Sequence, residues 1–129
     1  MTQKRALKTK TFARWMKKSN VQNQDLLCAI EEMERGLIDA DLGGSIYKKR
    51  IGLQGVGKRS GGRVILATQF MKRWFFMYGF SKNERSNISR DELLYLQEMA
   101  KRLLHLTDDE IDIAINENEL KEVKNDEKK

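Results

Sequence analysis

Cysteine, histidine and proline are nearly missing from this chain of 129 residues, which has one cysteine, one histidine and no proline. Cys28 alone cannot form an internal disulfide or a multi-cysteine zinc site, and we expect it to be a small core residue of a helix. His105 alone cannot form a His–His metal pair, and it lies far along the chain from the basic segment described below. We therefore expect no metal ion, no cofactor and no histidine-based catalysis.

Long apolar runs are also missing, since no stretch approaches the roughly 18 apolar residues that a membrane helix needs. The N-terminal segment carries Lys and Arg and lacks the apolar stretch of a secretory signal. No Ser/Gly-rich linker divides the chain. The sequence therefore predicts a small cytoplasmic protein, with one domain over residues 1–123 and a charged tail over residues 124–129.

Acidic residues are scarce in the middle of the chain. Residues 42–90 hold 11 Lys and Arg but a single acid, Glu84, whereas residues 91–129 hold 12 Asp and Glu against 6 Lys and Arg. Solubility does not require such segregation, and a one-sided field attracts polyanions. Nucleic acid is the first candidate partner, because Lys and Arg neutralise its phosphates.

Helices are expected near both ends of the chain. Apolar residues recur at helical spacing over residues 11–18, and a second helix, capped by Asn20 or Asn23, reaches to about residue 35. Ser89 and Thr107 each precede a Glu by three residues, which is the pattern of a capping box at the start of a helix. These features predict two N-terminal and two C-terminal helices.

Three strands are expected between these helices, over residues 45–53, 63–70 and 73–80, where β-branched and aromatic residues are frequent. A glycine-rich loop over residues 54–62 separates the first strand from the second, and a short additional strand is expected near residues 7–9. The predicted fold is α+β, with two N-terminal helices packed on a small antiparallel β-sheet and with C-terminal helices.

Basic residues meet in this fold if the strands pair as a meander. Strand alternation places Lys48 and Arg50 on one face and Lys49 on the other. Clustered cations stabilise charge on a phosphate, and a lysine among them is a candidate acid or base for cleaving RNA through its own 2′-hydroxyl. The residues expected to converge are Lys48, Lys49 and Arg50, then Lys58, Arg59 and Arg63, and finally Arg73, Lys82 and Arg85.

Three segments in succession resemble the RelE superfamily of type II toxin–antitoxin toxins, and most closely its HigB-like branch. They read DADLGGSIYKKRI, GVGKRSGGRVILA and RWFFMYGFSKNERSNISRDEL, and the resemblance spans about residues 10–123. It implies a RelE-like fold and a metal-independent endoribonuclease that cleaves messenger RNA on the translating ribosome. It also implies neutralisation by a cognate antitoxin, which we expect to be of the helix-turn-helix type.

The resemblance also suggests roles for the matching basic residues. Arg63 and Arg73 would clamp the scissile phosphate, and Lys58 or Lys82 would move protons. One departure from the family is Gly62, where many relatives have an aromatic residue; if that residue stacks on a base, Tyr47, Trp74 or Tyr78 must replace it here. The remaining residues expected to bind RNA are Lys48, Lys49, Arg50, Arg59 and Arg85.

Two other functions remain open on the sequence alone. The first is a ParE-like toxin that inhibits a DNA topoisomerase without cleaving RNA, because related scaffolds support both activities. The second is a non-toxic member that only binds nucleic acid. The basic loop and the paired basic segments favour RNA cleavage over both.

Overall fold

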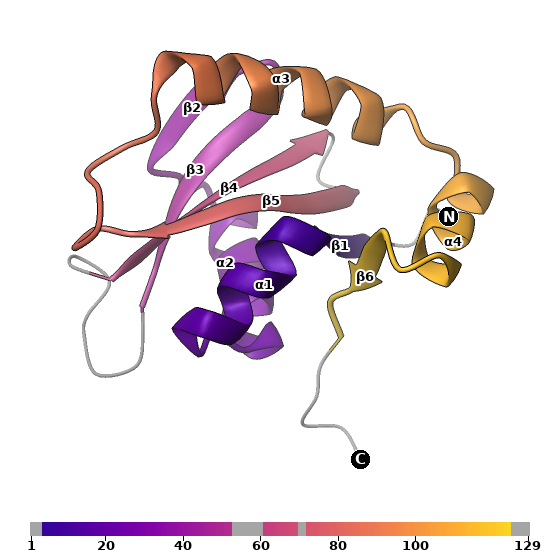
Figure 1. The fold of residues 1–129 in the computed structure, drawn as a ribbon, viewed down its shortest axis with the longest axis horizontal. Helices are drawn as coiled ribbons and strands as arrows, with labels where there is room; N and C mark the ends of the chain where they lie inside the picture. Colours follow the sequence, from indigo (N-terminus) through magenta and orange to yellow (C-terminus); the bar gives the residue numbers. More distant parts are fainter. Residues whose placement is uncertain (1–3, 53–60, 70–71, 125–129) are drawn as a thin grey trace.

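A six-stranded β-sheet lies at the centre of the computed structural model, which describes residues 4–52, 61–69 and 72–124. Its spatial order is β2-β3-β4-β5-β1-β6 (Figure 1). Neighbouring strands pair antiparallel, except that β1 and β5 are parallel. The strands are β1 (Arg5–Thr9), β2 (Ala40–Gly43), β3 (Ile46–Ile51), β4 (Gly62–Gln69), β5 (Arg73–Ser81) and β6 (Leu120–Glu122).

The prediction of a purely antiparallel sheet is wrong, because β1 inserts between β5 and β6 and runs parallel to β5. The additional strand expected near residues 7–9 is confirmed as part of β1. The strands β2 and β6 were not predicted, since four and three residues are too few to show an alternating pattern. The predicted meander of β3, β4 and β5 is confirmed.

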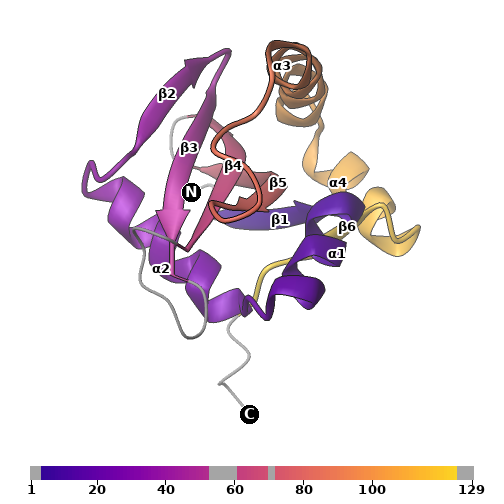
Figure 2. The ribbon, with the colours of Figure 1, turned by 60° about the vertical axis from the view of Figure 1, so that its left-hand side comes forward.

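Helices cover both faces of the sheet (Figures 1 and 2). The helices α1 (Lys10–Ser19) and α2 (Asn23–Glu34) pack on one face, where Phe12 and Leu26 meet Trp74 and Phe76 of β5. The helices α3 (Arg90–Leu104) and α4 (Asp108–Asn116) pack on the other face, against the remaining core residues, such as Phe75. No helix in the described segments is both long and apolar enough to cross a membrane.

Local capping interactions fix where the helices begin. The capping boxes predicted at Ser89 and Thr107 are both present, at the first turns of α3 and α4. The asparagine cap predicted for α2 is wrong, because Gln22 is its N-cap and exchanges hydrogen bonds with Asp25. Asn20 instead ends α1 in a left-handed conformation, with φ of 59°, which asparagine tolerates better than most residues.

Cys28 lies on the exposed side of α2, so the prediction that it is a core residue is wrong. Its neighbours Ala29 and Ile30 are buried. Cys28 therefore lies just outside the apolar stripe of α2. Consecutive residues of a helix point in different directions, so a side chain next to a buried one in the sequence can be exposed.

Candidate functional site

The register of the β3–β4–β5 meander brings two arginines side by side at one end of the sheet. Arg50 of β3 lies directly opposite Arg63 of β4, and Arg63 lies opposite Phe80 of β5. Directly opposed residues share a face of the sheet and have Cβ atoms about 5 Å apart. This face is the one that α3 covers, because Ile65 and Phe80 belong to its core cluster. Lys48 shares it, two residues before Arg50.

These three cations differ in their access to solvent. The Arg50 side chain is 51% exposed, and its Nε lies 3.2 Å from Oδ2 of Asp39. Lys48 is half-buried and donates to Oδ1 of Asn87 at 3.5 Å. Arg63 is buried, at 5% exposure, and donates from Nη1 to the Gly62 carbonyl at 3.3 Å. Lys48 and Arg50 therefore present charge at the surface, while Arg63 lies behind them on the same face.

The segment after β5 adds two more cations to this end of the sheet. The backbone N–H of Lys82 donates to the Gly61 carbonyl at 3.0 Å, which holds Lys82 beside the start of β4, and its side chain is exposed. Arg85 lies over the ring of Phe80, with its guanidinium carbon 5.9 Å from the ring centre. Five cations therefore come from β3, β4 and the segment that follows β5. They are Lys48, Arg50, Arg63, Lys82 and Arg85, which we call the sheet-end cluster.

Arg85 is held in place by α3. Its two terminal nitrogens donate to Glu92 at 2.6 Å and 2.9 Å, its Nε donates to the Asn87 carbonyl at 2.9 Å, and Nη1 also donates to the Tyr78 hydroxyl at 3.1 Å. The bonds from Arg85, and then the bond from the Ser89 backbone, lower the pKa of Glu92 from 4.5 to about 2. The same pairing raises the pKa of Arg85. The charge of Arg85 is therefore balanced by Glu92, and Arg85 orients Tyr78.

Lys49 does not join the sheet-end cluster, and its side chain lies on the opposite face from Lys48, as the alternation along β3 predicts. It points to the opposite face, where its Nζ lies 2.7 Å from Oε1 of Glu32 on α2. The Lys49 side chain is only 6% exposed. Lys49 is therefore an internal ion-pair residue that joins β3 to α2.

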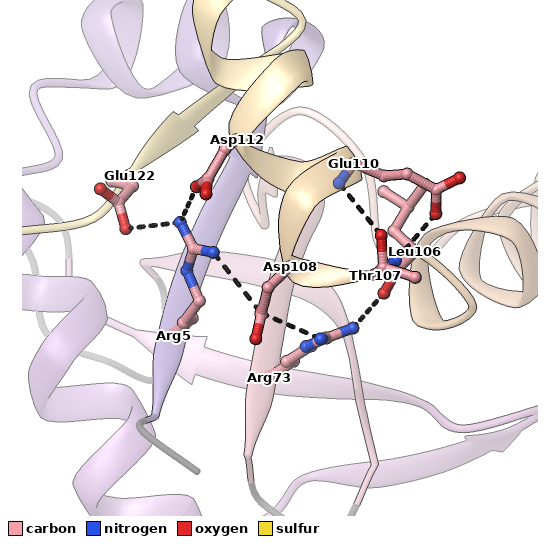
Figure 3. Close-up of polar contacts among 8 residues, drawn as sticks. All are labelled: Arg5, Arg73, Leu106, Thr107, Asp108, Glu110, Asp112 and Glu122. Atoms are coloured by element: carbon pink, nitrogen blue, oxygen red, sulfur yellow. Dashed lines mark hydrogen bonds and ion pairs between the residues drawn. The ribbon is translucent and has the colours of Figure 1, made fainter.

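Arg73 also lies away from the cluster, so the expectation that it meets Arg63 is wrong. It is opposite Gln69, at the start of β5, whereas Arg63 is opposite Phe80 at the other end of that strand. Figure 3 shows that Arg73 donates to the Leu106 carbonyl and to Asp108, where Nη2 and Oδ1 are 3.0 Å apart.

A second arginine contacts the same acidic segment near the start of β5. Arg5 contacts Asp108, Asp112 and Glu122, at 3.5, 2.9 and 3.3 Å (Figure 3). Burial lowers the pKa of Arg5, but its contacts with Asp112 and Glu122 outweigh this effect and raise the pKa above its usual value. Arg5 and Arg73 therefore tie β1 and β5 to α4 and β6, where acidic side chains surround their charges.

Lys58 and Arg59, which were expected to belong to the site, lie outside the described residues. Of the aromatic residues considered for base stacking, Trp74 is fully buried and Tyr47 packs against the core on the α1–α2 face. Tyr78 is on the same side of the sheet as Arg63 and lines a hollow of about 230 Å³ with Tyr95 and Glu92. No local pattern in the sequence points to Tyr95, which is 61% exposed on α3.

This arrangement, a mixed sheet with several cations at one end and aromatic residues beside them, defines a small protein suited to binding a polyanion. The model of one protein family matches residues 4–123 and is described as the RelE toxin of the RelE / RelB toxin-antitoxin system. The chain therefore belongs to the RelE toxin family, and it is a toxin whose partner is an antitoxin. A search of the curated proteins found no match.

Proposed function

We propose that this toxin is a HigB-like endoribonuclease that cuts messenger RNA on the ribosome and thereby inhibits translation. RelE toxins are generally ribonucleases. The observation that carries the proposal is the sheet-end cluster, in which Arg50 and Arg63 are cross-strand neighbours with Lys48 and Lys82 at the same end of the sheet. Such a cluster can hold the phosphates on either side of the bond to be cut.

The proposed reaction is attack of the RNA 2′-hydroxyl on the neighbouring phosphorus, with release of the 5′-oxygen and formation of a cyclic phosphate. One bond forms between the 2′-oxygen and phosphorus while the bond from phosphorus to the 5′-oxygen breaks. A base takes the 2′-hydroxyl proton, and an acid gives a proton to the leaving 5′-oxygen. We assign the proton transfer to Lys82 or Lys58 and the stabilisation of phosphate charge to Arg63 with Arg50.

We assign a smaller set of residues to RNA than the sequence alone suggests. Lys49 and Arg73 are left out, because each is engaged elsewhere in the fold. Arg85 is bound to Glu92 and lies against Tyr78, so we assign it the positioning of Tyr78 rather than a direct phosphate contact. Tyr78 is then the aromatic residue proposed to stack on a base.

The test compares two exposed lysines that flank β5 at opposite ends, Lys82 and Lys72. We expect Lys82→Ala to reduce mRNA cleavage in a reconstituted translation reaction at least tenfold, since general acid or base groups contribute about 10²–10⁴-fold. Lys72→Ala, which removes the same charge at the far end, is expected to stay within about twofold of the unmodified toxin.

Mapping of the cut sites by primer extension shows whether loss of protein synthesis follows RNA cleavage. Equal cleavage by the Lys82→Ala and Lys72→Ala variants would refute the site. Intact messages together with a DNA damage response after induction would instead identify a ParE-like topoisomerase inhibitor. Intact messages with unimpaired growth would identify a member that only binds nucleic acid.

A further inference from the structure

A second basic surface lies on the opposite side of the sheet from the sheet-end cluster. A groove of about 630 Å³ runs between α1, the start of α2, and the neighbouring strands β1 and β6. Both ribbon views place α1 beside β1 and β6 (Figures 1 and 2). Five cations line the groove, and none of the described residues that line it is acidic. These cations are Lys8, Lys10, Arg14, Lys17 and Lys121, which we call the groove cluster.

Regular elements, rather than loops, fix the spacing of the groove cluster. Lys10, Arg14 and Lys17 follow one another at intervals of four and three residues, so they form a stripe along one side of α1 with neighbours about 5–6 Å apart. On the strands, Lys8 of β1 lies directly opposite Lys121 of β6. Like charges directly opposed in a sheet are destabilising, so this pair is unfavourable for folding and indicates a requirement for positive charge.

Most of this charge is not balanced inside the protein. Lys10 pairs with Glu119 at 3.6 Å, and Lys8 donates to Oδ1 of Asn23 at 2.8 Å. Arg14, Lys17 and Lys121 are exposed and form no ion pair with any residue that the structure describes. The groove therefore offers at least three cations to a ligand.

We infer that the groove cluster binds the phosphate backbone of RNA at a site separate from the sheet-end cluster. The remaining lining favours RNA over an acidic protein segment, because side-chain amides outnumber apolar residues. Nucleic-acid interfaces are polar and positively charged, whereas protein interfaces depend on buried apolar anchors at their centre. The amides are Asn20, Gln22, Asn23 and Asn118, and the apolar residues are Ala13, Met16 and Val21.

The inference rests on the proposed function and deepens it, since a second RNA contact increases the affinity of an RNA-cutting toxin for its target. RNA lying along the groove would bind mainly through phosphates, so its affinity is expected to depend on salt and little on sequence. The site differs from the cleavage site in its elements and in its face of the sheet, because α1 and α2 pack on the face opposite α3.

The experiment measures binding of a fluorescent 2′-O-methyl RNA oligonucleotide over a range of KCl concentrations. The methyl group blocks the 2′-hydroxyl, so the toxin cannot cut this RNA. The assay therefore measures binding without cleavage. The groove variant carries Arg14→Ala, Lys17→Ala and Lys121→Ala. The control variant carries Lys18→Ala, Lys72→Ala and Lys101→Ala, which removes three charges that are also exposed but lie outside the groove.

Each phosphate contact to a single strand contributes about 0.7 to the slope of log K against log salt. Relative to the unmodified toxin, we expect the magnitude of this slope to fall by about 2 in the groove variant. In the control variant we expect it to fall by less than about 0.5. Equal slopes for the two triple variants, or binding of a polyglutamate peptide as tight as that of RNA at the same salt, would overturn the inference.

Lys82→Ala separates this inference from the proposed function. It is expected to reduce mRNA cleavage in the translation reaction at least tenfold, while lowering the magnitude of the slope by no more than about 0.7. If the unmodified toxin cuts no RNA but the groove variant still loses slope, the proposed function fails and the groove assignment stands. If cleavage depends on Lys82 but the groove variant keeps the slope of the control variant, the groove assignment fails alone.

Discussion

Replacing Glu92 with glutamine is expected to destabilise the toxin at neutral pH and to leave it nearly unaffected in acid. Glutamine can still accept the hydrogen bond from the Ser89 backbone, which measures 2.7 Å. It loses the negative charge that receives two hydrogen bonds from Arg85. The substitution therefore isolates the ion pair from the helix cap.

The magnitude follows from the pKa of Glu92, which falls from 4.5 to about 2 in the folded protein. Converted directly, this difference corresponds to about 3.4 kcal/mol. Because the Glu92 side chain is 36% exposed, solvent screening reduces the expected contribution to about 1 kcal/mol. A lowered carboxyl pKa stabilises the folded state above about pH 4.5, and this stabilisation is lost as the pH falls toward 2.

Glu110 provides a matched control, since it occupies the same capping-box position on α4 and accepts from the Thr107 backbone at 2.8 Å. No arginine bonds to it among the described residues. In urea denaturation followed by circular dichroism, we expect Glu92→Gln to lose about 1 kcal/mol at pH 7 and almost nothing near pH 2. Glu110→Gln is expected to lose at most about 0.5 kcal/mol. Equal losses at pH 7, or a Glu92→Gln deficit that does not change with pH, would refute this reasoning.

Three further substitutions test the structural roles assigned above. Arg73→Ala is expected to cost about 2 kcal/mol in urea denaturation, because it removes charge-assisted bonds to α4 and the preceding loop, while RNA cleavage per folded molecule stays unchanged. Lys49→Met is expected to cost about 2 kcal/mol by removing the cation that pairs with Glu32 at 2.7 Å, and adding Glu32→Leu should restore most of the loss, which a double-mutant cycle measures. Gly79→Ala is expected to lower the melting temperature, since a Cβ there would lie 2.3 Å from the Trp15 ring, and Trp15→Leu should reduce that penalty.

The end of the strand that each residue occupies explains why Arg63 and Lys82 lie together and why Arg73 lies apart from them. The β-branched and aromatic runs predicted β4 and β5, and their antiparallel pairing follows from a short connection. Arg73 and Lys82 stand at the two ends of β5, nine residues apart, which is about 30 Å in an extended chain. Two residues so far apart cannot both contact one phosphate. The length of β5 alone therefore argues against Arg73 as a partner of Lys82 in the site. Antiparallel pairing then places Arg63 with Lys82.

Other parts of the site depend on tertiary contacts that local patterns do not encode. Alternation along β3 placed Lys49 on the opposite face from Lys48, as observed. The sequence does not show that α2 brings Glu32 onto that face, which turns Lys49 into an internal ion-pair residue. The pairing of Arg85 with Glu92 is similarly hidden, because the segment between them makes a turn with no regular period.

The acidic C-terminal third of the chain determines which cations remain available to a ligand. Its residues Asp108, Asp112 and Glu122 surround Arg5 and Arg73 at one end of the sheet (Figure 3). The charge at that end is therefore largely cancelled, and the excess of basic residues is left at the opposite end of the sheet and along α1. The net charge of +6 does not by itself say where on the protein a polyanion would bind. Its separation within the fold concentrates the field on the two surfaces where RNA is proposed to bind.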